Sequence, residues 1–324
     1  MDELNPMVLK GFGRHLKNVS KTRGAYICNT DCGIRQIKKL DKKAEEIIFE
    51  YNVQQQLYNN GFKNIEKFEL SLDGLPYYIF DDGIYTMSKY IDGIEASLNK
   101  NTQEIVLQLA SMHKSAYGVK STAIGKNEDL IILLEKRISE MSRLRKRLLQ
   151  LSNRTKLEVM ILKNYEYYYE LCQKSIEMLK KSKYSNIRQE SLKKGEFCHN
   201  NYREENLILN IDGLYIVNFE NCQNNIHITD LVNIIRRSIK NKECTEQEAF
   251  MMLEEYDKVK TLTKEEKEVI AALLFFPYKF LKICNKYYNS RKNWVQNNMI
   301  YSLEQYFEVK EKNEKFLKLL EKNV

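Results

Sequence analysis

The spacing of apolar residues changes near residue 90, and this change constrains the fold more than any other feature of the sequence. Before it, short runs of β-branched and aromatic residues are separated by turn residues, as in strands. After it, apolar residues recur with the period of amphipathic helices. Only 3 Pro and 12 Gly in 324 residues are available to interrupt those helices. The sequence therefore predicts an α+β protein, with a small β-sheet lobe over residues 1–90 and a larger helical lobe over residues 91–324.

The small lobe is expected to contain a hairpin, further strands and one helix. Residues 24–40 predict the hairpin, because two strand-like runs flank a polar turn. Residues 44–59 predict the helix, because their apolar side chains share one face before Gly61 ends the pattern. Further strands are expected at 64–70, 75–80 and 84–90.

The larger lobe is expected to be helical with one polar interruption. A helix is predicted over 102–117 with Thr102 as its N-cap, and a long basic helical stretch over 130–181. Between about 193 and 223, short apolar runs predict a hairpin. From residue 229 onward the helical pattern returns.

Charge and composition narrow the possible functions. The chain has 52 Lys+Arg and 44 Asp+Glu, a net charge of +8, which favours anionic partners only mildly. The basic run 143–147 (RLRKR) is flanked by Glu135, Glu140 and Glu158, so a solvated helix face is expected there and nucleic acid is an unlikely partner. A polyanion-binding protein remains an alternative.

Several compartments are disfavoured by the same composition. The 7 Cys follow no metal-ligand or disulfide spacing, which indicates reduced thiols in a cytosolic protein. No apolar run approaches the ~20 residues of a membrane-spanning helix. The first ten residues carry Asp2 and Glu3 and no apolar core, so we expect no signal peptide.

A polar segment at 198–209 (CHNNYREENLIL) carries the strongest chemical signal. It resembles the catalytic loop of aminoglycoside and choline phosphotransferases, which has His-Gly-Asp, four residues, then Asn and an apolar strand. His199 and Asn206 are in register, but Asn201 holds the position of the catalytic aspartate. Twelve residues after Asn206, Asn218 lies in IVNFE, which resembles the metal-binding motif with its aspartate replaced. Asp230 resembles the aspartate that braces the loop.

The resemblance also assigns residues in the small lobe. Lys38, at the end of the second hairpin strand, corresponds to the lysine that holds the nucleotide phosphates. Glu50 in the following helix is expected to pair with Lys38, as the lysine and helix glutamate of kinases do. Met87 is expected to line the nucleotide cleft.

Further motifs resemble the CotS-type spore-coat family over nearly the whole chain. They are LYNNGF at 57–62, DGLPY at 73–77, LASMH at 109–113, FFPYKF at 275–280 and NKYYN at 285–289. The resemblance implies the two-lobed, protein-kinase-like fold of aminoglycoside phosphotransferases. It also implies synthesis in the mother-cell cytoplasm, deposition in the spore coat and other coat proteins as partners.

The two amides decide what activity is expected. An amide at position 201 cannot accept a proton, and loss of a general base costs ~10²–10⁴ in rate. An amide at position 218 gives a magnesium ion no charged ligand. We therefore expect a pseudokinase with a structural role in coat assembly and no cofactor. The alternative is an active phosphotransferase that uses ATP and magnesium with displaced carboxylates, of which Glu204, Glu205 and Glu220 are candidates.

Overall fold

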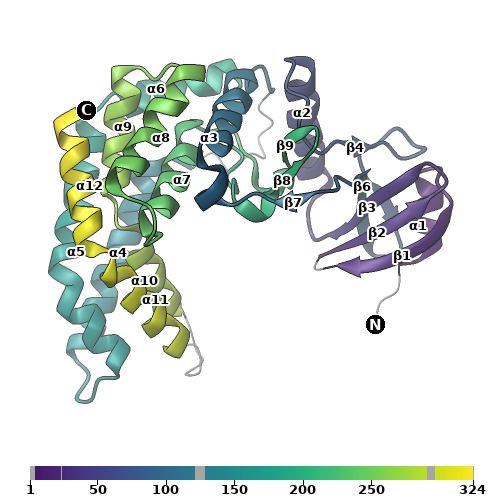
Figure 1. Ribbon diagram of the computed structural model, residues 1–324. Helices are drawn as coiled ribbons and strands as arrows, with labels where there is room; N and C mark the ends of the chain where they lie inside the picture. Colours follow the sequence, from purple (N-terminus) through teal and green to yellow (C-terminus); the bar gives the residue numbers. More distant parts are fainter. Residues whose placement is uncertain (1–3, 23, 121–127, 290–295, 324) are drawn as a thin grey trace. The chain divides into compact units, whose positions relative to one another are not determined.

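The computed structural model describes residues 4–22, 24–120, 128–289 and 296–323 (Figure 1). The chain forms two compact units, each built from two segments. The first unit is Met1–Lys126 with Glu190–Asp230, and the second is Asn127–Gln189 with Leu231–Val324. The lobe boundary expected after residue 90 stays a prediction.

An antiparallel six-stranded sheet forms most of the N-terminal part of the first unit. Its order is β1-β2-β3-β6-β4, and β5 also pairs with β6. The strands are β1 (Leu16–Thr22), β2 (Ala25–Thr30), β3 (Gly33–Leu40), β4 (Phe68–Glu69), β5 (Tyr78–Phe80) and β6 (Gly83–Lys89). A short helix, α1 (Pro6–Gly11), packs its buried Val8 and Leu9 into the same hydrophobic cluster as Ile37.

The hairpin predicted over 24–40 is confirmed by β2 and β3. The strand β1 was missed, because six of its seven residues are exposed and it has no apolar alternation. The strand predicted over 64–70 was too long, since only Phe68–Glu69 pairs as a strand with β6. The exposure of β1 therefore explains why it was not predicted, and the two-residue pairing of β4 explains why its predicted range was too long.

Helix α2 (Ala44–Asn59) spans the predicted residues. It begins where the Glu46 carboxylate accepts a hydrogen bond from the Lys43 N–H at 3.1 Å, a capping-box contact. Its buried face also carries two polar residues, Glu50 and Gln54. Gln54 Oε1 accepts from the Phe68 N–H at 3.0 Å, which ties α2 to the edge of the sheet.

A second, three-stranded sheet joins distant parts of the first unit. It contains β7 (Ile94–Glu95), β8 (Leu207–Asn210) and β9 (Gly213–Ile216), of which β8 and β9 are the hairpin predicted within 193–223. Helix α3 (Leu98–Ser115) follows β7. The predicted cap was wrong, because Ser97 caps α3 one turn earlier and the Thr102 hydroxyl donates to the Leu98 carbonyl inside the helix.

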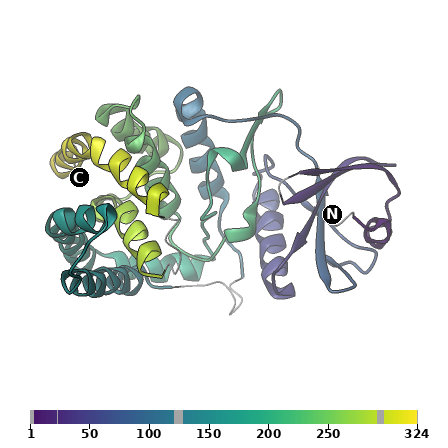
Figure 2. The same cartoon turned by 90° about the horizontal axis from the view of Figure 1, so that it is seen from below.

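The second unit is helical (Figure 2). The single stretch predicted over 130–181 is in fact two helices, because Thr155 and Glu158 form a capping box that starts the second of them. These are α4 (Leu130–Leu149) and α5 (Lys156–Lys181), and α5 packs against both α4 and α9. The remaining helices are α6 (Tyr184–Lys194), α7 (Ile228–Lys240), α8 (Glu246–Val259), α9 (Lys264–Phe275), α10 (Tyr278–Asn289), α11 (Gln296–Glu308) and α12 (Lys310–Asn323). Over the described ranges, no helix has the length and apolar character needed to cross a membrane.

Candidate functional site

The loop after α6 is held by Asp230, at the start of α7. The Asp230 carboxylate accepts the backbone N–H of His199 at 2.6 Å and that of Asn200 at 2.8 Å. It also contacts Nε2 of His113, from α3, at 3.2 Å. Burial alone would raise the pKa of Asp230, but these hydrogen bonds and the two histidines lower it overall. Asp230 is therefore an ionised brace that fixes the backbone of the loop.

His199 uses both ring nitrogens to shape this loop. Its Nε2 lies 3.1 Å from the Val217 carbonyl, which can only accept, so Nε2 carries the proton. Its Nδ1 accepts the Asn201 N–H at 3.2 Å. Burial lowers the pKa of His199 to about 4, so the ring is neutral. His199 therefore positions the loop and has no nitrogen left to act as a base.

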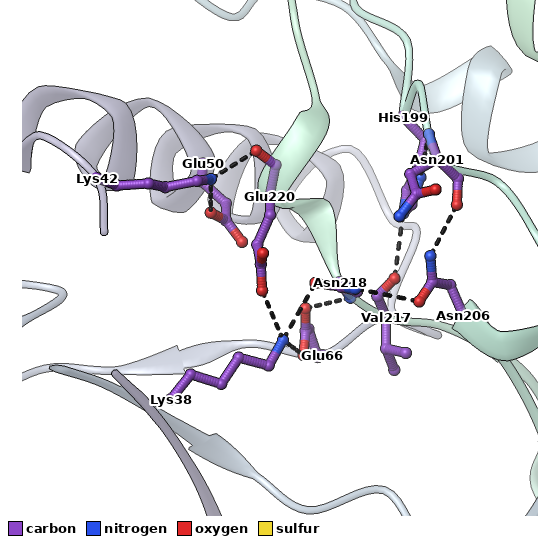
Figure 3. A network of polar contacts seen from close by, with 10 residues as sticks. All are labelled: Lys38, Lys42, Glu50, Glu66, His199, Asn201, Asn206, Val217, Asn218 and Glu220. Atoms are coloured by element: carbon purple, nitrogen blue, oxygen red, sulfur yellow. Dashed lines mark hydrogen bonds and ion pairs between the residues drawn. The ribbon is translucent and has the colours of Figure 1, made fainter. Parts of the chain in front are cut away.

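A chain of amide hydrogen bonds runs through the centre of the site, and we name it the amide relay (Figure 3). Lys38 Nζ donates to Asn218 Oδ1 at 3.2 Å, and Asn218 Nδ2 donates to Asn206 Oδ1 at 3.2 Å. Asn206 Nδ2 then donates to the Asn201 carbonyl at 2.8 Å. A donor-only ammonium at one end and an acceptor-only carbonyl at the other fix the orientation of both side-chain amides.

The backbone at Asn218 is held in an unusual conformation. Its φ of 67° and ψ of 61° place it in the left-handed region, which asparagine tolerates better than most residues. The Asn218 N–H donates to Oε1 of Glu66, a buried residue between α2 and β4. Glu66 could not be selected from the sequence, because it belongs to no motif and lies 152 residues from Asn218 along the chain.

Lys38 is surrounded by carboxylates. Its Nζ lies 3.2 Å from Glu220 Oε1 and 4.0 Å from Glu66 Oε2, and its side chain is 14% exposed. Burial acts to lower the pKa of Lys38, but Glu66, Glu220 and Glu50 outweigh it and raise the pKa overall. Lys38 is therefore a charged ammonium whose charge is neutralised inside the protein.

Glu50 has a different partner from the one expected. Its Oε2 lies 3.4 Å from Nζ of Lys42, and Lys42 also donates to the Glu220 carbonyl at 2.5 Å. Glu50 is 1% exposed, and within the described part of the chain its Oε1 has no hydrogen-bond partner. Burial raises the pKa of Glu50 to about 8. Lys42, which follows β3, takes the glutamate that sequence analysis assigned to Lys38.

A cavity of about 390 Å³ lies beside these residues, between α2 and the segment after Asn218. Lys42, Glu50 and Glu220 line it, together with Asn200 from the loop. Its volume lies within the range of small-molecule pockets. Asp41 and Glu46 also line it, so acidic residues outnumber the single lysine in its wall.

Three other residues selected from the sequence have contacts outside the amide relay. Met87 is fully buried in the hydrophobic cluster that contains Cys28 and Ile37. Glu204 accepts the Leu98 N–H at the start of α3, at 2.6 Å. Glu205 pairs with the exposed Arg203 at 3.1 Å, so of the three candidate carboxylates the structure brings only Glu220 next to Lys38. Among the described residues, no three or more His, Cys, Asp and Glu side chains form a group that could hold a metal ion.

Residues 7–320 match the family model described as "Spore coat putative kinase YutH". The chain belongs to this family. The match extends over both units, and it confirms the spore-coat family indicated by the sequence motifs. No curated protein matches this chain.

Solved structures show the fold of this family member. The aminoglycoside phosphotransferase from Alicyclobacillus acidocaldarius superposes with a TM-score of 0.87 at 16% identity, covering 100% of this chain and 97% of the other. Spectinomycin phosphotransferase, solved with ADP and spectinomycin, gives 0.70 at 12% identity, covering 97% and 96%. Choline kinase from Cryptosporidium parvum gives 0.51 at 13% identity, covering 98% and 94%. The predicted α+β, kinase-like fold is confirmed.

Proposed function

We propose that this member of the spore-coat kinase family is a pseudokinase that supports coat assembly as a structural scaffold. The amide relay is the observation that carries the proposal. In it, hydrogen bonds between neutral amides take the place of the charged ligands that a metal–nucleotide complex requires. We further propose that the protein is made in the mother-cell cytoplasm and is then deposited with other coat proteins.

The relay does not fit a magnesium ion. Magnesium prefers oxygen ligands in octahedral geometry and is usually bound through carboxylates. Here the side-chain oxygens of Asn206 and Asn218 already accept hydrogen bonds. A divalent ion between these two oxygens would have to displace the Nδ2 donor of Asn218 and would approach the Lys38 ammonium. Neither Asn206 nor Asn218 supplies a carboxylate to offset the repulsion between the two cations.

The loop also has no proton acceptor at the position expected for the catalytic base. The amide of Asn201 is not basic, and both ring nitrogens of His199 are used within the loop. Loss of a general base alone slows a reaction ~10²–10⁴-fold. Together with the unsuitable metal ligands, this favours a binding or scaffolding role over phosphoryl transfer.

An active phosphotransferase is the second candidate, and one observation favours it. Glu66 and Glu220 bring two carboxylates to Lys38, next to Asn218. If Lys38 contacted a nucleotide phosphate in place of Glu66 and Glu220, these two carboxylates would be available to bind a cation. The two candidates differ in whether the wild-type protein responds to magnesium.

Aspartate in place of Asn218 tests the proposal. In this variant, the carboxylate oxygen that replaces Nδ2 would face Asn206 Oδ1, so two acceptors would oppose each other. Rotating the Asn206 amide by 180° would not relieve this, because Oδ1 would then face the Asn201 carbonyl. We expect Asn218→Asp to cost about 1–3 kcal/mol of unfolding free energy without magnesium. Millimolar magnesium should restore most of this loss, because a cation fits between the two oxygens. Urea unfolding with and without magnesium at matched ionic strength measures both effects.

The wild-type protein and Asn164→Asp, on α5, are the controls. Neither should be stabilised by magnesium beyond the effect of sodium at the same ionic strength. If magnesium stabilises the wild-type protein and Glu220→Gln removes that effect, the second candidate is correct and the pseudokinase proposal fails.

A further inference from the structure

A small basic pocket lies in the second unit, remote in sequence from the amide relay. Arg236 and Lys240 from α7 line it, with Tyr278 and Lys279 from the first turn of α10. Its volume is about 20 Å³, enough for one or two water molecules and therefore for a small group, not a whole organic ligand. The pocket also includes Phe275–Pro277, which belong to the FFPYKF motif at 275–280. No residue of this motif lies in the candidate functional site.

Lys240 has only cations among its strong electrostatic neighbours. Burial lowers the pKa of Lys240 to about 7, and the contributions that follow come from Arg236, Lys279, Arg237 and Lys282, all of the same sign. Within the described ranges, no carboxylate forms an ion pair with Lys240, Lys279 or Lys282. Burying a charge without a counter-charge is costly, so a bound anion would stabilise the charged forms of Lys240 and Lys279.

Among the described residues, the contacts of Arg236 are with neutral groups. Its guanidinium donates to the Leu273 carbonyl and to Asn233 Oδ1 at 3.5 Å, and it lies 5.6 Å from the centre of the Tyr278 ring. Its buried Nε has no acceptor among the described residues. A guanidinium and two lysines that line one pocket supply the donors and the positive charge that an oxyanion requires.

The basic run that sequence analysis singled out is different. Arg145 pairs with Glu166 and lies 4.6 Å from the centre of the Tyr165 ring, and Arg137 pairs with Glu140 on the same helix. Arg145 within the run, and Arg137 one turn or more before it, are therefore each paired with a carboxylate. Lys240 on α7 and Lys279 on α10 differ from them, because among the described residues no carboxylate forms an ion pair with either.

We propose that the pocket formed by Arg236, Lys240, Tyr278 and Lys279 binds a phosphate group. A phosphate carries up to two negative charges and several acceptor oxygens, which suits converging cations better than a single carboxylate does. Inorganic phosphate and a phosphate monoester share this chemistry. The site is independent of the proposed function, because none of its residues belongs to the amide relay.

Isothermal titration calorimetry of the full chain tests the site, with inorganic phosphate in one arm and glycerol 3-phosphate in the other. We expect saturable binding of at least one of them at constant ionic strength. The double variant Lys240→Gln/Lys279→Gln should weaken this binding at least tenfold. Lys163→Gln, which removes an exposed lysine on α5, should leave the affinity unchanged.

A second measurement shows that the double variant still folds. In phosphate-free buffer its unfolding midpoint should be higher than that of the wild-type protein, because repulsion between the cations is relieved. Binding of the monoester alone would assign the site to an esterified phosphate. The proposal is overturned if neither compound binds, or if the double variant binds as tightly as the wild-type protein.

Discussion

Glutamine in place of Glu50 should stabilise the folded protein by about 3 kcal/mol at pH 7 and change its stability little at pH 4. The pKa of Glu50 rises from 4.5 to about 8 in the folded state because the carboxyl is buried. Between pH 4.5 and about 8, Glu50 is therefore protonated in the folded protein and ionised in the unfolded chain. Wild-type stability then falls as the pH rises from about 4.5 to 8, at about 1.4 kcal/mol per unit. Glutamine mimics the neutral acid and removes this dependence.

Urea unfolding of both proteins between pH 4 and pH 8 measures the difference. Glu205→Gln is the matched control, since this exposed glutamate pairs with Arg203 at the surface, and its effect should stay within about 0.5 kcal/mol. A Glu50→Gln variant that is less stable than the wild-type protein at pH 8 would show that Glu50 is an ionised partner of Lys42.

Alanine in place of Asp230 should have an effect of similar size and opposite sign. The change leaves the N–H groups of His199 and Asn200 without this acceptor and removes one contact of His113. Loss of one member of a buried, charged contact costs about 3–5 kcal/mol. Asp230→Asn should cost less, because one amide oxygen can still accept one of the two N–H groups.

The pH dependence of Asp230 has the opposite direction to that of Glu50. The pKa of Asp230 is lowered in the folded state, so its contribution is present at neutral pH. That contribution is lost as the pH falls below 3.8 through the folded pKa. Denaturant unfolding at neutral and acidic pH checks this, and equal losses for Asp230→Ala at both would contradict the ionised brace.

Residues fixed by local pattern could be predicted, whereas residues fixed by long-range packing could not. Helix α2 follows from its apolar face and from Gly61, and both signals lie within its own sequence. The spacing from His199 to Asn206 similarly marks the loop. Glu66 could not be found in this way, because its contact with Asn218 depends on how the chain packs around β9.

The partner of Glu50 shows the same limit at short range. Lys38 and Lys42 lie four residues apart near the end of β3, and the sequence gives no reason to prefer Lys42. In the folded chain, Lys38 Nζ donates to Asn218 and Glu220, whereas Lys42 Nζ is the ammonium that contacts the Glu50 carboxylate, at 3.4 Å (Figure 3). Which lysine contacts Glu50 depends on side-chain positions in the folded protein, and neither secondary-structure propensity nor the spacing of apolar residues encodes these positions.

Titration of the wild-type protein with ATP, in the presence and absence of magnesium, tests the central claim most directly. If the amide relay replaces the metal ligands, calorimetry should detect no binding that depends on magnesium. Saturable, magnesium-dependent binding of ATP to the wild-type protein, abolished by Glu220→Gln but not by Glu205→Gln, would contradict the account.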